Sequence, residues 1–148
     1  MRVLALDYGS ARCGCALSDP SGTIVTPLDP VERPATRRGL ARLRELVTER
    51  EAGIVVVGLP LSLGGGDSEQ TLQTREFAAR LESVLGDRVP VELYDERFTT
   101  RLAQRDARLP GAAPRASEDS RAAAHLLESW LAARNRGAGS GSDSGHSR

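Results

Sequence analysis

Residues 2–19 read RVLALDYGSARCGCALSD and contain the first two strands of the predicted fold. Residues 2–7 are rich in Val and Leu, and a turn signal follows them, so we expect a strand that ends in Asp7. Residues 12–18 predict a second strand, and a third follows at about 23–28. Three strands joined by short turns predict an antiparallel meander.

The pattern then alternates between helices and strands. The helices follow from apolar residues at three- and four-residue spacing, and the central strand follows from a continuous β-branched run, which is typical of burial on both faces. We expect these elements at residues 36–51 (helix, ended by Gly53), 54–58 (strand), 68–85 (helix, capped by Asp67 or Ser68), 89–94 (strand), 99–109 (short helix) and 118–134 (helix, capped by Ser117). The apolar face of the second helix is expected to hold Leu72, Phe77, Leu81, Val84 and Leu85. This order predicts an α/β domain with a mixed five-stranded sheet, in which βαβ crossovers continue three antiparallel strands.

Composition suits one soluble domain. The chain has 148 residues and a formal net charge of zero, and no apolar run approaches the ~20 residues that span a bilayer. The start of the sequence lacks the pattern of a signal peptide, so we expect a cytoplasmic protein without membrane contact. We assign residues 1–136 to the domain and residues 137–148 to a disordered Gly/Ser-rich tail. Cys13 and Cys15 are too close along one strand to bridge, and we interpret them as small buried hydrophobes.

All the basic side chains are arginines, and they gather in two segments. The first group is Arg33, Arg37, Arg38, Arg42, Arg44 and Arg50. A solvated helix face explains this group at least as well as a phosphate-binding surface. The second group is Arg97, Arg101, Arg105, Arg108, Arg115 and Arg121. It flanks the candidate site described next, which favours a functional role there.

Three acids are candidates for a catalytic centre. Asp7 ends the first strand on an otherwise apolar face, Asp95 and Glu96 follow the fifth strand, and Asp119 lies in the first turn of the last helix. Each has a structural alternative: Asp7 could cap a turn, and Asp119 could satisfy the helix dipole. Gathered at one sheet edge, carboxylates without His or Cys suit Mg²⁺ or Mn²⁺, and two such ions support phosphodiester hydrolysis. Strand alternation alone does not decide between Asp95 and Glu96.

Four motifs, in order, resemble those of the YqgF proteins, also called RuvX or Holliday-junction-resolvase-like proteins. They are residues 4–19 (LALDYGSARCGCALSD), 56–65 (VVGLPLSLGG), 95–100 (DERFTT) and 119–127 (DSRAAAHLL). The resemblance covers about residues 1–134. It implies a ribonuclease H-like fold and a metal-dependent nuclease that acts on structured nucleic acid. The family is associated with 5′-end maturation of pre-16S ribosomal RNA, and an older assignment makes it a resolvase of branched DNA.

The resemblance carries the catalytic and metal-binding roles to Asp7, Glu96 and Asp119, with Asp95 as an alternate ligand. We also expect substrate binding by Gly9, Arg12, Arg97 and Thr99. Arg12 and Arg97 lie within a few residues of a proposed ligand, and a guanidinium can bind two phosphate oxygens. The family often has a lysine where this chain has Ala11, which puts one phosphate contact in doubt. Arg97 could instead pair with Asp95 or Asp119 and hold the acids in place.

Two other functions compete with a nuclease. The turn after the first strand resembles the phosphate loop of actin-like sugar kinases, but those proteins bind nucleotide between two such domains and this chain holds one. A non-catalytic binder of nucleic acid or of the assembling ribosome is the alternative outside enzymes, and the presence of all three acids speaks against it. The sequence does not decide whether the substrate is RNA or DNA, and it does not decide the oligomeric state.

Overall fold

The computed structural model describes residues 1–61, 64, 66–98 and 118–145. Its elements are β1 (Arg2–Asp7), β2 (Arg12–Ser18), β3 (Val25–Glu32), α1 (Arg37–Glu49), β4 (Ala52–Leu59), α2 (Glu69–Leu85), η1 (Gly86–Arg88), β5 (Val91–Asp95), η2 (Glu96–Phe98) and α4 (Glu118–Gly145). The predicted short helix at 99–109 and the Ser117 cap lie outside the described residues. No helix in the described part of the chain is both long and apolar enough to cross a membrane.

The strands form one sheet in the order β3-β2-β1-β4-β5. The pairs β1–β2 and β2–β3 are antiparallel, whereas β1–β4 and β4–β5 are parallel. The predicted mixed five-stranded α/β sheet is therefore confirmed. The parallel strands β1, β4 and β5 point the same way, so their carboxyl ends meet at one edge of the sheet.

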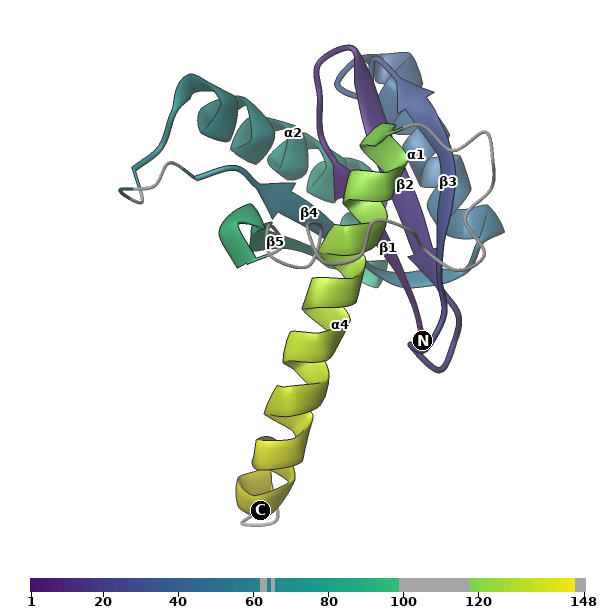
Figure 1. Ribbon diagram of the computed structural model, residues 1–148. Coiled ribbons are helices and arrows are strands. Elements are labelled where there is room, and N and C mark those ends of the chain that lie inside the picture. Colours follow the sequence, from purple (N-terminus) through teal and green to yellow (C-terminus); the bar gives the residue numbers. More distant parts are fainter. Residues whose placement is uncertain (62–63, 65, 99–117, 146–148) are drawn as a thin grey trace.

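Helices cover the two faces of the sheet separately. The helices α1 and α2 lie on one face and α4 crosses the other, as Figure 1 shows. Alternation along β1 divides the core accordingly: Leu4 and Leu6 pack toward α1 and α2, and Val3 and Ala5 pack toward α4.

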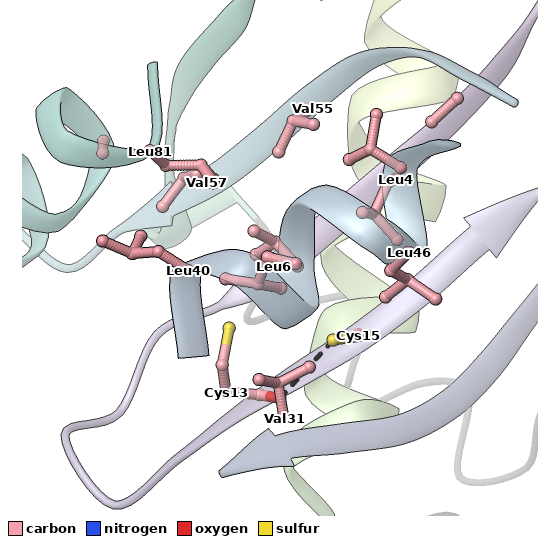
Figure 2. Close-up of a cluster of buried hydrophobic side chains, with 14 of the residues drawn as sticks. Leu4, Leu6, Cys13, Cys15, Val31, Leu40, Leu46, Val55, Val57 and Leu81 are labelled. Atoms are coloured by element: carbon pink, nitrogen blue, oxygen red, sulfur yellow. Dashed lines mark hydrogen bonds between the residues drawn. The ribbon is translucent and has the colours of Figure 1, made fainter. Parts of the chain in front are cut away.

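The first of these two clusters fills the space under α1 (Figure 2). Cys13 and Cys15 belong to it as free, buried thiols. The interpretation of the cysteines as small hydrophobes is thereby confirmed, and both serve the packing of β2 against α1.

The first helix ends earlier than predicted. Its cap Thr36 accepts a hydrogen bond from the Gly39 backbone nitrogen at 3.0 Å, and the helix stops at Glu49. Glu51 takes the left-handed conformation (φ 56°) that reverses the chain. The prediction that Gly53 ends this helix is wrong, because Gly53 already lies inside β4.

Two other predictions about the elements are wrong. The third strand continues to Glu32 through Pro27 and Pro30, which β3 tolerates because it is an edge strand. On α2, Leu72 is 56% exposed, and the buried positions near it are Thr71 and Thr74. The buried Thr71 hydroxyl donates to the Pro60 carbonyl, so Thr71 rather than Leu72 takes the inward position in the first turn of α2.

The last helix continues through Gly145, past Arg134 where we expected it to end. The extension contains no proline, so nothing interrupts its backbone hydrogen bonds, although its Gly/Ser composition lowers helix propensity. Figure 1 shows this part of α4 projecting beyond the sheet. The boundary of the domain at Arg136 stays a prediction.

Candidate active site at the carboxyl ends of three strands

Sheet register places the acids at one edge. Asp7 is the last residue of β1 and lies opposite Gly14 on β2. On the other side of β1, Leu6 pairs with Val57, so Gly58 follows beside Asp7. Gly58 in turn pairs with Tyr94 on β5, one strand farther out. The strand β4 therefore separates Asp7 from the segment that carries Glu96.

Glu96 crosses this separation because Gly58 has no side chain. A Cβ added to Gly58 would lie 2.7 Å from Oε2 and 2.9 Å from Cγ of Glu96. The side chain of Glu96 thus passes over the backbone of β4, and its carboxyl group hydrogen-bonds to that of Asp7. Glu96 begins the 3-10 turn η2 rather than ending β5, which frees its backbone from strand alternation.

Burial and like charge make this pair unusually basic. The pKa of Asp7 is raised from 3.8 to about 7, first by burial, then by the negative charge of Glu96 and their shared hydrogen bond, and last by the charge of Asp119. Burial also raises the pKa of Glu96, with a further contribution from Asp95, while the hydrogen bond to Asp7 opposes the rise. Two crowded carboxyls with raised pKa values favour either a shared proton or a bound cation.

Asp95 takes a different partner. Its carboxylate accepts a hydrogen bond from Nη2 of Arg97 at 2.7 Å and another from the Arg97 backbone nitrogen at 2.9 Å. This partner lowers the pKa of Asp95, so that carboxylate stays charged. Glu96 is therefore the acid that contacts Asp7. Asp95 pairs instead with Arg97, and this pairing is the structural alternative for Arg97 that the sequence left open.

Asp119 is held at the start of α4 against β2. A Cβ at Gly14 would collide with the Asp119 backbone carbonyl, so the helix reaches the strand only because Gly14 is there. The next residue, Ser120, is fully buried, and its hydroxyl accepts a hydrogen bond from the Cys15 backbone nitrogen at 3.2 Å. The Asp119 carboxylate pairs with Nε of Arg12 at 3.3 Å, and both side chains are about half exposed.

The structure therefore joins two of the three acids directly. Asp7 and Glu96 are in contact, and Asp119 is close enough for its charge to raise the pKa of Asp7. Within the described ranges, no three His, Cys, Asp or Glu side chains are close enough together to hold one metal ion in this arrangement. The convergence of all three carboxylates on a metal stays a prediction.

The chain resembles known proteins over most of its length. A family model described as "RuvX: Holliday junction resolvase" matches residues 1–133. The chain belongs to the RuvX family. A relative from Maridesulfovibrio salexigens is 38% identical over 135 residues, which cover 89% of this chain and 98% of the relative. A relative from Mycobacterium leprae (strain Br4923) is 42% identical over 136 residues, with 88% and 72% covered.

Both relatives carry the name "Putative pre-16S rRNA nuclease". Among solved structures, RuvC of T. thermophilus in complex with a Holliday junction aligns with a TM-score of 0.63 at 20% identity, covering 90% of this chain and 95% of that one. The Fowlpox virus resolvase, also with junction DNA, aligns at 0.55 and 10% identity, with 90% and 98% covered. The ribonuclease H-like fold is confirmed, and so is the nuclease, a hydrolase of ester bonds.

The remaining sequence-predicted residues of this RuvX protein have mixed outcomes. Thr99 lies outside the described residues. A glycine is needed at position 9 for a structural reason, because a Cβ there would lie 2.7 Å from the Arg12 carbonyl oxygen. Its binding of substrate, and that of Arg12 and Arg97, stay predictions.

Sequence reasoning gave no role to Gly14, Gly58 or Ser120. Each stands in a motif that we matched to the family, but the reason for a glycine appears only when a second element crosses it. The signal available in the sequence was a glycine inside a strand pattern, which often marks close approach of another segment.

Proposed function

We propose that this RuvX protein cleaves structured RNA in the 5′-end processing of pre-16S rRNA, with Asp7, Glu96 and Asp119 as its catalytic acids. The contact between Asp7 and Glu96 across Gly58 carries the proposal. The relatives' name supplies the substrate. Asp7 and Glu96 come from segments that β4 separates, and both have raised pKa values. This contact has no evident structural task, whereas a site for a cation accounts for both acids.

The donor atoms present suit Mg²⁺ or Mn²⁺. All three acids offer carboxylate oxygen only, which hard divalent ions prefer over softer metals. Asp7 and Glu96 would hold such an ion between them, and the repulsion that now raises their pKa values would turn into attraction. When bound, such ions activate water and stabilise the leaving oxygen of a phosphodiester.

Arg12 and Asp119 supply an exchangeable pair. Because both side chains are about half exposed, the ion pair between them contributes little to stability, about 0–1 kcal/mol. Its members can therefore separate at low cost. We expect the Asp119 carboxylate to turn toward Asp7 as the third ligand, while the Arg12 guanidinium turns to a substrate phosphate.

Asp7→Asn tests the catalytic role. We expect cleavage of a pre-16S leader RNA in Mn²⁺ to fall roughly a hundredfold or more, since loss of one ion removes several kcal/mol of transition-state stabilisation. Filter binding of the RNA in Ca²⁺ should change little, because it depends on arginines and on shape. The control is Asp29→Asn, an exposed acid on the distant edge strand β3, which should cleave at the wild-type rate.

A second substrate has specific support. The family description names Holliday junctions, and the RuvC fold is the one that the chain shares. The same assay therefore includes a four-way DNA junction and plain RNA and DNA duplexes. Preferred cutting of the junction would replace the RNA proposal with a resolvase. Wild-type cleavage by Asp7→Asn would overturn the metal site and leave a non-catalytic binder as the better account.

A further inference from the structure

A groove runs between α1 and α2 on the sheet face opposite α4. It has a volume of about 580 Å³. Its lining consists of Arg37, Leu40, Ala41, Arg44, Glu76, Ala79, Arg80, Ser83 and Val84. The catalytic acids lie on the other side of the sheet, because Asp7 shares its face of β1 with Val3 and Ala5, which pack toward α4. The groove is thus separate from the nuclease site.

The groove exists because both helices direct their large apolar side chains at the sheet. Leu43 of α1 and Phe77 and Leu81 of α2 are fully or almost fully buried in the cluster beneath. The residues left to face the neighbouring helix include the small Ala41 and Ala79, which are exposed and do not fill the space between the helices. The result is an apolar floor that no part of the described chain covers.

Positive charge lines this floor. The side chains of Arg37, Arg44 and Arg80 are exposed, and none of these side chains has a hydrogen bond or ion pair with another described residue. Their neighbours differ: Arg42 on α1 pairs with Glu45 at 3.1 Å, and Arg75 on α2 pairs with Asp67 at 3.1 Å. The described lining residues include one acid, Glu76, against three arginines, so this part of the groove carries an excess of positive charge.

We propose that this groove binds an acidic amphipathic helix of a partner protein. Apolar side chains one turn apart on such a helix would lie on the floor formed by Leu40, Ala41 and Ala79, as in other helix-in-groove complexes. Glu or Asp residues beside that stripe would reach the three arginines. A nucleic acid fits less well, because the lining contains no aromatic ring for a base to stack on and its floor offers phosphates no donors.

The probe is a synthetic helix of about 16 residues with a leucine stripe flanked by glutamates, long enough to form a helix on binding. Fluorescence anisotropy with the full chain should give saturable binding, and amide shifts should map to α1 and α2. A scrambled peptide of the same composition should bind at least about tenfold more weakly, because it loses the stripe but keeps the charge.

Matched variants locate the site. Arg44→Ser combined with Arg80→Ser should weaken peptide binding about tenfold, whereas Arg38→Ser, also exposed on α1 but outside the lining, should change it less than about twofold. Ala79→Glu places a charge on the floor and should abolish binding. All of these positions are exposed, so melting temperature and cleavage should match the wild type.

Four results would overturn the proposal. The first two are a lack of saturable binding by the peptide and equally tight binding of the scrambled peptide. The third is that the groove variants weaken binding no more than Arg38→Ser does. The fourth is that duplex RNA, added at the same concentration of negative charges as the peptide, displaces it. The last result would make the groove part of an RNA-binding surface. Because the readout is peptide binding, failure here leaves the proposed cleavage chemistry untouched, and failure of Asp7→Asn leaves the groove untouched.

Discussion

Two glycines determine how the three candidate acids are placed. Gly58 lets Glu96 cross β4 to reach Asp7, and Gly14 lets the start of α4 rest on β2 so that Asp119 comes near. Neither glycine has a positive φ, so conformational freedom is not the reason for either one. Space is the reason: each position is crossed by another segment at a distance that no Cβ permits.

Gly58→Ala adds one methyl group and tests whether Glu96 needs the space above Gly58 to reach Asp7. The new methyl group would lie 2.7 Å from Oε2 of Glu96, which must then swing away from Asp7. Because that oxygen is the end of a flexible side chain, we expect the fold to survive. Mn²⁺ affinity, measured by calorimetry, should fall roughly tenfold, as for other residues that orient ligands.

The control for this variant is Gly64→Ala, where an added Cβ has nothing within 4 Å. It should bind Mn²⁺ as the wild type does. Equal Mn²⁺ affinity of Gly58→Ala and the wild type would show that Glu96 is not a ligand. Asp95 would then be the candidate to test next.

Asp19 provides a pH-dependent contribution to stability in the β2–β3 turn. Its carboxylate accepts hydrogen bonds from the Ser21 hydroxyl at 2.6 Å and from the backbone nitrogens of Thr23 and Ile24 at 2.8 Å each. These bonds, that of Ser21 first, lower the pKa of Asp19 from 3.8 to about 2. Since the folded pKa lies below the unfolded one, the stabilisation is complete above about pH 4 and is lost as pH falls through about 2.

Asp19→Asn should therefore melt below the wild type at pH 6, and the difference should shrink as pH falls from about 4 to about 2. Thermal melts at several pH values measure it. Asp29→Asn, at an exposed position on β3, is the comparison. A difference that stays constant down to pH 2 would mean that the charged form of Asp19 is not what stabilises the turn.

At the scale of elements, the sequence pattern predicted those helices and strands that depend mainly on interactions between residues near in sequence. The antiparallel strands, the buried β4 and both helices α1 and α2 follow from periodicity and caps, so they were found within a few residues. The error in the apolar face of α2 lies where a distant contact decides. Leu72 was placed inside because its spacing fits, but Thr71, which donates a hydrogen bond to the Pro60 carbonyl, is the buried residue there and Leu72 is exposed.

The site shows the same division. The acids could be chosen from their positions after strands and from the family motifs. That Glu96 rather than Asp95 meets Asp7 could not be derived, because the choice depends on the 3-10 turn after β5 and on the empty space over Gly58. Strand alternation stops applying where the strand ends.

The cap of α2 is one local signal that can be tested directly. Ser68 Oγ accepts from the Thr71 backbone nitrogen, and Thr71 Oγ1 accepts from the Ser68 nitrogen, each at 3.2 Å, which completes a capping box. Ser68→Ala should cost about 1 kcal/mol, or roughly 2–4 °C of melting temperature. Ser83→Ala, exposed near the other end of α2, should melt as the wild type does. Equal melting of both variants would show that the box contributes nothing.

For the whole molecule, the sheet separates two kinds of surface. The acids and α4 occupy one face, and the arginine-lined groove occupies the other. The net charge of zero does not reveal this division, because the 20 acidic and 20 basic residues balance over the whole chain but are unevenly distributed between the two faces. A nuclease centre and a protein-binding surface on opposite faces could be occupied together, because neither ligand would cross the sheet.

The last helix is held on its face of the sheet by contacts around Trp130 and Arg134. Trp130 is 5% exposed, its Nε1 donates to Glu92 at 2.9 Å, and the Arg134 guanidinium lies 5.0 Å from the centre of its ring. At the residue before Trp130, the hydroxyls of Ser129 and Tyr94 lie within hydrogen-bonding distance at 2.9 Å. Beyond these contacts the helix leaves the sheet, and an added Cβ on Gly137 would have nothing within 4 Å.

Truncation after Arg136 should therefore leave melting temperature and cleavage unchanged, because residues 137–148 are rich in Gly and Ser, and burial of apolar area does not offset the entropy of ordering them. Truncation after Glu128 removes Ser129, Trp130 and Leu131 from the core and should leave the chain unfolded at 37 °C, as judged by circular dichroism. A drop of several degrees in the shorter truncation would show instead that the tail docks on the domain. The helix through Gly145 would then be part of the fold rather than a continuation of α4 that the sheet does not support.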